Sequence, residues 1–144
     1  MLNLGNEAEI IRVYEADTIA GNATDESDQV DMSGGEAVCF IVAAGTLGAA
    51  GLTVRAHQSD DEFVADDDEL DGSEIVLAVA DSDLLAVIDL GKPEKQYIRV
   101  EMEAGADDCD IDDVIAIKYR LRDLPATEDA TVAETVVLIT PDAV

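Results

Sequence analysis

The side chains that could do chemistry in this chain are one histidine, two cysteines and many carboxylates. The 144 residues include 34 acidic residues, 8 basic residues and a single histidine, His57. A Ser-His-Asp arrangement would need His57 as its base, and Ser59 and Asp60 lie beside it in the sequence. Because successive residues of a strand point to opposite faces, this closeness does not assemble a triad. We therefore predict an exposed strand histidine near carboxylates, no catalytic residue and no enzyme.

The acidic loops are the candidate metal sites. Asp67, Glu69 and Asp71, followed by Gly72, mimic the start of a calcium-binding loop, but Ala78 occupies the position of the bidentate Glu. A second cluster could gather a divalent cation if its loop folds back, and it consists of Asp107, Asp108, Asp110, Asp112 and Asp113. The incomplete calcium pattern favours solvated loops with diffuse cations, and no cofactor is expected.

The two cysteines lie in different surroundings. Cys39 is inside an apolar run and is predicted to be a buried, small apolar residue. Cys109 lies in an acidic segment, where nearby carboxylates disfavour the thiolate. Such different settings do not predict a disulfide.

Charge is the strongest signal in the composition. A net charge of −26 repels nucleic-acid phosphates and anionic membranes, so neither is an expected partner. The chain is rich in Asp and poor in Lys, and molar salt shortens the Debye length to about 3 Å, which removes most self-repulsion. This balance favours a protein of a halophilic host over an acidic protein from an ordinary or marine source. The sequence shows neither a membrane-spanning apolar stretch nor a signal peptide, and we expect a soluble chain.

The positions of the apolar residues predict strands. Runs that alternate or are apolar throughout occur at residues 9–14, 37–44, 52–58, 74–80, 84–90, 96–103 and 114–121. Residues 74–80 and 84–90 are interpreted as a hairpin, and residues 59–72 as an acidic loop anchored by Phe63 and Val64. We predict an all-β domain at residues 9–125, a β-sandwich or barrel-like domain of about seven to nine strands. Residues 1–8 are a short arm, and residues 126–144 a C-terminal strand or arm.

The run from Ala37 to Ala44 is apolar at every position. It predicts a central strand that is covered on both faces, or on one face by a neighbouring subunit. Basic residues are rare and fall on or beside the predicted strands, where they can pair with carboxylates across strands or across a subunit boundary. They are Arg55, Arg99, Lys118, Arg120 and Arg122.

Several short patterns, in order, carry a resemblance. They are Asp31-Met32-Ser33-Gly34, Val38 to Val42, Val54 to Asp61, Ile88-Asp89-Leu90, Lys95 to Val100, Val114 to Arg120 and Pro125. Over residues 30–125 the chain resembles a group of small head-module proteins of tailed viruses, the capsid decoration or cement proteins. The resemblance implies a β-rich domain that clips to the outside of the shell, often as a trimer, with terminal arms across capsomer boundaries. No catalytic residues are known for the group.

The expected function is therefore that of a structural virion protein, which decorates and stabilises a tailed-virus capsid by bridging its subunits. Its expected partners are the major capsid protein and further copies of the chain, with a homotrimer favoured, on the outer surface of particles assembled in the host cytoplasm. Contact residues are predicted at Leu2, Leu4, Val38, Phe40, Val42, Arg99 and Arg120.

Two alternatives stay open. The first is a tail or head–tail junction protein, which would form a ring. The second is a calcium- or carbohydrate-binding β-sandwich module. Sugar binding would need exposed aromatic rings, and the chain has only Tyr14, Phe40, Phe63, Tyr97 and Tyr119.

Overall fold

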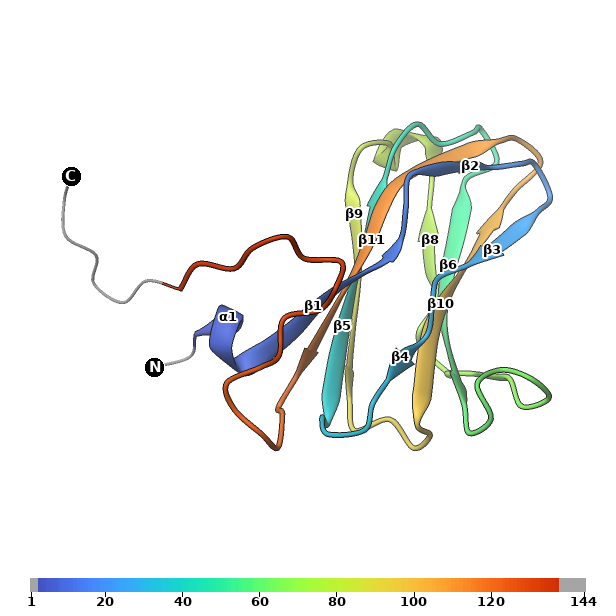
Figure 1. Cartoon of the computed structure of the whole chain (residues 1–144). Coiled ribbons are helices and arrows are strands. Elements are labelled where there is room, and N and C mark those ends of the chain that lie inside the picture. Colours follow the sequence, from blue (N-terminus) through green and yellow to red (C-terminus); the bar gives the residue numbers. More distant parts are fainter. Residues whose placement is uncertain (1–2, 138–144) are drawn as a thin grey trace, which may run out of the picture.

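Apolar residues at every second position give the strands of this chain one inward and one outward face. In the computed structural model, which describes residues 3–137, these strands form two antiparallel sheets that pack face to face (Figure 1). The predicted all-β sandwich is confirmed, but the described chain has eleven strands instead of seven to nine. The additional strands are pieces of two or three residues between the longer predicted strands.

The strands divide between two sheets. Sheet A has the order β1 (Ala8–Tyr14), β11 (Cys109–Tyr119), β5 (Ala37–Ala44), β9 (Leu85–Gly91), and β2 (Asp17–Ile19) also pairs with β11. Sheet B has the order β3 (Thr24–Glu26), β10 (Tyr97–Ala104), β6 (Leu52–Ser59), β7 (Asp68–Glu69), with β4 (Val30–Asp31) on β10 and β8 (Ile75–Leu77) on β6. Outside the sheets lie α1 (Leu4–Glu7) and the 3-10 turn η1 (Val79–Asp81).

The core lies between the sheets and is almost entirely aliphatic. Phe40 of β5 is fully buried, and so are Ile98, Val100 and Met102 of β10. These three were predicted to face inward from the alternation of residues 96–103, and the structure confirms that face. Because each apolar side chain that leaves water contributes roughly 1.5–3 kcal/mol, these two layers stabilise the sandwich without any tryptophan.

The predicted hairpin of residues 74–80 and 84–90 is wrong. Strand β8 pairs with β6 of sheet B, whereas β9 pairs with β5 of sheet A. The connection contains η1, where the Asp81 carboxylate accepts the backbone N–H of Ala78 at 2.8 Å. The Ser82 hydroxyl then accepts the backbone N–H of Leu47 at 3.0 Å. These bonds hold a connection that is too long for a tight hairpin and that carries the chain from one sheet to the other.

The two cysteines are exchanged relative to the prediction. Cys109 begins β11 and is fully buried, and its thiol donates to the carbonyl oxygen of Gly51 at 3.4 Å. Cys39 is half-buried on the outward side of β5, where burial and then the charge of Asp89 raise the pKa of its thiol. Both thiols are free. The acidic residues around Cys109 concealed a strand that begins five residues earlier than the alternation indicated.

The terminal segments pack together beside sheet A, where the C-terminal segment runs past α1 and β1 (Figure 1). The backbone N–H of Ala126 donates to the carbonyl oxygen of Asn6 at 2.6 Å. A Cβ at Gly5 would lie 2.6 Å from the Val137 side chain, so a larger residue at this position would displace that side chain. Residues 134–137 are not in a strand. The predicted contact residue Leu2 and the rest of the predicted run 134–140 lie outside the described residues. Within residues 3–137, no helix has the length and apolar character needed to cross a membrane.

Candidate functional site

The outward side of sheet A is apolar across its centre. Strand β5 places Ile41 directly between Ile115 of β11 and Val87 of β9. Val87 is 51% exposed and Leu85 is 60% exposed, while the isoleucines are half-buried. We call this surface the apolar face, and it consists of Cys39, Ile41, Ala43, Leu85, Val87, Ile115 and Ile117. A contiguous, exposed apolar surface of this kind is a feature of interaction sites.

Among the described residues, the charged groups that adjoin the apolar face lie at its rim. At one end Arg12 pairs with Asp113, with 2.8 Å between Nε and Oδ1. At the other end the Tyr119 hydroxyl donates to the Asp89 carboxylate at 2.6 Å, and this bond and burial raise the pKa of Tyr119. These bonds hold the carboxylates of Asp113 and Asp89 at the rim, away from the centre of the apolar face. A protein surface can approach the centre without burying an unpaired charge.

Three of the predicted contact residues are on the wrong side of β5. Val38, Phe40 and Val42 are all 0% exposed and fill the core. Because the side chains of a strand alternate, the outward set is the intervening one, Cys39, Ile41 and Ala43. The prediction placed the contact on the inward residues of this strand, because residues 37–44 are apolar on both faces and their pattern does not show which face is inward.

The other predicted contact residues fall in different places. Leu4 of α1 is 46% exposed and lines a shallow apolar pocket together with Cys39 and Leu124. The guanidinium of Arg120 lies 5.8 Å from the centre of the Tyr119 ring. Arg99 is committed to contacts within the chain, on the opposite sheet.

The outward side of sheet B is the electrostatic opposite of the apolar face. Neighbouring strands place acidic and basic side chains opposite one another: Arg55 of β6 bonds to Glu74 at 3.0 Å, and to Glu103 of β10 at 2.8 Å. The bond to Glu103 is the main reason that the pKa of Arg55 is raised. We call this surface the charged face, and it consists of Glu26, Arg55, His57, Asp67, Arg99, Glu101 and Glu103.

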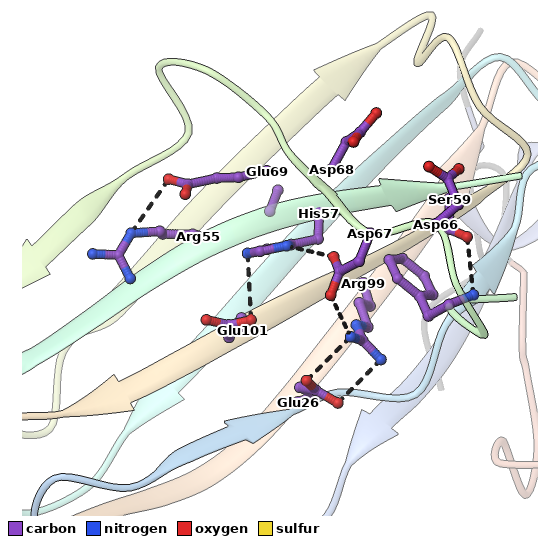
Figure 2. A network of polar contacts seen from close by, with 12 residues as sticks. Glu26, Arg55, His57, Ser59, Asp66, Asp67, Asp68, Glu69, Arg99 and Glu101 are labelled. Carbon is purple, nitrogen blue, oxygen red and sulfur yellow. Dashed lines mark hydrogen bonds and ion pairs between the residues drawn. The ribbon is translucent and has the colours of Figure 1, made fainter.

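Arg99 holds an acidic loop onto the charged face (Figure 2). Its guanidinium pairs with Glu26 and with Asp67, both at 3.0 Å, and lies 4.0 Å from the centre of the Phe63 ring. Phe63 therefore anchors the loop, as predicted, whereas Val64 is 84% exposed and does not. The prediction that Arg55 and Arg99 pair with carboxylates of other strands is confirmed.

Lys95 fixes the same loop at a second point. Its ammonium bonds to both Asp66 oxygens at 2.7 Å and to Asp68 at 2.6 Å. These bonds raise the pKa of Lys95, and the bond from Lys95 is the main reason that the pKa of Asp66 is lowered. The acidic loop of residues 59–72, which the sequence predicted to be anchored by apolar side chains, is thus also held by two basic side chains.

His57 lies beneath this loop (Figure 2). It is only 8% exposed, so the prediction of an exposed histidine is wrong. Its Nδ1 lies 2.7 Å from Asp67, and its Nε2 lies 3.4 Å from Glu101 with no hydrogen-bond partner. Among residues 3–137, these three residues form the one cluster whose potential ligand atoms all lie within 4.8 Å of one another. The sequence placed His57 on a strand near carboxylates. Its burial depends on the loop that contains Asp67, and a local pattern does not report such a contact.

The carboxylates of residues 107–113 have separate contacts. The carboxylate of Asp108 accepts the backbone N–H of Gly21 at 2.9 Å, and that of Asp110 accepts the Thr18 hydroxyl at 2.6 Å. Asp113 pairs with Arg12 at the rim of the apolar face. Asp107 and Asp112 are exposed. In this part of the described chain the strand β11 therefore spaces the carboxylates along the sheet.

Comparisons with known proteins add little to these observations. No family model matches the chain, and no curated protein does. Solved structures with a similar arrangement include a pilus protein of Bacillus endospore appendages, with 14% identity, a TM-score of 0.46, and coverage of 80% of this chain and 91% of that one. Another is TmCBM61, solved with β-1,4-galactotriose, with 17% identity, a TM-score of 0.44, and coverage of 72% and 68%. PirA follows with 15% identity, a TM-score of 0.40, and coverage of 74% and 92%. These likenesses are too distant to argue for a function.

Proposed function

We propose that this chain is a non-enzymatic structural protein, which decorates the outside of a tailed-virus capsid and associates with further copies of itself through the apolar face. The observation that carries the proposal is the apolar centre of sheet A, where Leu85 and Val87 are more than half exposed. The basis for proposing a virus capsid is the resemblance of residues 30–125 to capsid decoration proteins. Among the described residues of the charged face, the contacts of His57 are with carboxylates and not with a nucleophile.

A second copy of the chain is the occupant that fits the apolar face. Each molecule carries a net charge of −26, so two molecules can associate only where their surfaces bring few carboxylates together. The centre of the apolar face meets this condition, because its charged groups, Arg12, Asp89 and Asp113, lie at the rim. Burial of aliphatic side chains at such a surface contributes roughly 25 cal/mol per Å² before the costs of association.

The terminal segments are the proposed contact with the major capsid protein. They pack against each other beside β1, and Leu4 is 46% exposed there. A self-associated decoration protein presents several such segments at once. Each segment can bind weakly, since the copies held in one oligomer bind with a high effective concentration. A homotrimer matches the local symmetry at which three capsid subunits meet.

The carbohydrate-binding alternative has an observation against it. Stacking on a sugar needs an open aromatic ring, and the chain's aromatic side chains have other contacts. Phe40 is in the core, and Phe63 lies beneath the guanidinium of Arg99. The three tyrosine hydroxyls each donate to a carboxylate, those of Asp25, Glu62 and Asp89.

Immunogold labelling of intact virus particles tests where the chain is placed. Gold over the heads is the expected result, whereas gold over the tails would favour the head–tail junction or tail alternative. Particles without label, from a preparation in which the antibody recognises the denatured chain, would overturn the virion proposal. Light scattering of the purified chain in molar KCl tests self-association separately, and a mass of one chain at every concentration would overturn that part.

A further inference from the structure

We propose that His57 and Glu101 bind one divalent transition-metal ion of the zinc type, and that Asp67 orients the histidine for it. The first observation is an unpartnered nitrogen. His57 is only 8% exposed, yet its Nε2 makes no hydrogen bond. A buried polar atom without a partner is uncommon in folded proteins, and a bound ion is one of its explanations. This site lies on sheet B and does not depend on the function proposed for sheet A.

The second observation is the distance between the two proposed ligands. Nε2 of His57 and Oε2 of Glu101 are 3.4 Å apart. A hydrogen bond between a ring N–H and a carboxylate is about 2.7–3.0 Å long. Two ligands that each lie about 2.0–2.1 Å from a tetrahedral Zn²⁺ ion are separated by roughly 3.4 Å. The observed separation is therefore long for a charge-assisted hydrogen bond and matches a shared ion.

The third observation is the support behind the histidine (Figure 2). Its Nδ1 lies 2.7 Å from Oδ1 of Asp67, so a proton on Nδ1 is donated to that carboxylate. The other Asp67 oxygen accepts from Arg99 at 3.0 Å, which fixes the carboxylate. A proton held on Nδ1 leaves the lone pair of Nε2 directed toward Glu101. Metal-binding histidines characteristically donate their second ring nitrogen to a carboxylate in this way.

The chemistry of the donors selects the class of ion. An imidazole nitrogen binds Zn²⁺, Cu²⁺ or Ni²⁺ well, whereas Ca²⁺ and Mg²⁺ prefer oxygen ligands alone. Two protein ligands leave two tetrahedral positions for water or for a group from another molecule. The site is therefore an open one, and its selectivity over the many surface carboxylates comes from His57, the chain's single histidine.

Binding of Co²⁺ and Zn²⁺ to the full chain tests the site. Co²⁺ is a useful probe because four-coordinate Co²⁺ absorbs visible light more strongly than the hydrated ion. Titrations are made in molar KCl with excess Mg²⁺, which occupies the diffuse carboxylates. We expect one equivalent to bind to the wild type, and His57→Gln and Glu101→Gln to weaken binding roughly tenfold or more. Asp67→Asn should weaken binding and leave the stoichiometry unchanged. Glu103→Gln is the matched control, because Glu103 lies on the same strand and face but pairs with Arg55, and its binding should equal that of the wild type.

Nitrogen NMR of the single imidazole provides a test that needs no variant. Zn²⁺ should shift the Nε2 resonance and leave a protonated Nδ1. An imidazole that carries protons on both nitrogens in the presence of excess Zn²⁺ would overturn the proposal, and His57 would then be a cation held between two carboxylates. Equal Co²⁺ binding by the wild type and by a folded His57→Gln variant would overturn it as well.

Discussion

The two outward faces of this sandwich were made by the same strand pattern and have opposite chemistry. On sheet A, β5 places Cys39, Ile41 and Ala43 outward, and on sheet B, β6 places Arg55 and His57 outward. The inward residues of both sheets are aliphatic and interchangeable in kind. The difference shows that the inward set determines the fold, while the outward set determines what each face can meet.

The two faces also divide the charge of the chain. Three of the eight basic residues pair with carboxylates on the sheet B side, and they are Arg55, Lys95 and Arg99. These pairs neutralise part of the charge on sheet B and hold a loop across its surface. Within residues 3–137, no segment covers the centre of sheet A, where Val87 is 51% exposed. The basic residues of the charged face find acidic partners within one chain, whereas for the apolar face we propose a second copy of the chain as the partner.

A carboxylate in the apolar face should have the largest effect. Val87→Asp places an unpaired charge in the centre of the proposed contact, and we expect self-association in molar KCl to weaken by about 2 kcal/mol or more, roughly 30-fold. The matched control is Val76→Asp, because Val76 is 65% exposed on sheet B, opposite Thr53. Light scattering over a concentration series measures both. An equal loss in the two variants would show that added charge alone, and not the position on sheet A, controls association.

Salt should have the next largest effect, and it distinguishes net repulsion from local pairing. Screening weakens the ion pairs of the charged face but relieves the repulsion of a net charge of −26. Since exposed pairs contribute little, relief of repulsion should dominate, and the melting temperature should rise by about 10 °C from dilute to molar KCl. Sucrose is the control, because it favours burial without screening charge. A melting temperature that falls as KCl is added would mean that the pairs on sheet B stabilise the chain more than repulsion destabilises it.

The strands were predictable from sequence because alternation is a local signal. Residues 37–44 were assigned with the bounds that the structure has, and the inward face of β10 was correct. Three features were not predictable from local pattern. The outward set of β5 was assigned to the core residues around Phe40, because both of its faces are apolar. The pairing of β8 and β9 depended on which sheet each strand joins, and the burial of His57 depended on a loop held by Arg99 from a strand 42 positions along the chain.

A change in the geometry of one basic residue tests how the charged face holds its loop. Arg99→Lys keeps the charge but removes the planar fork that contacts Glu26, Asp67 and the Phe63 ring. We expect a loss of about 1–2 kcal/mol in the free energy of unfolding by urea. Arg55→Lys is the comparison, because the acidic partners of Arg55 are about half exposed, and it should cost less than about 1 kcal/mol. If Arg55→Lys costs as much as Arg99→Lys, the stacking on Phe63 and the covered loop do not contribute.

The acid dependence of one ion pair, that of Asp66 and Lys95, should be the smallest effect. Asp66 bonds to Lys95, and this lowers its pKa below the ordinary value of 3.8. A carboxyl whose pKa is lower in the folded chain adds stability at pH values above 3.8, and that stability is lost as the pH falls through the lower, folded pKa. The melting temperature of the wild type should therefore exceed that of Asp66→Asn at neutral pH, and the difference should shrink below about pH 4. Asp71→Asn removes the same charge from a residue that has no ion pair among those described, and it shows how much of the effect is net charge. Melting curves in molar KCl measure all three proteins. If the difference in melting temperature between wild type and Asp66→Asn stays constant into acid, the ion pair with Lys95 is not its cause.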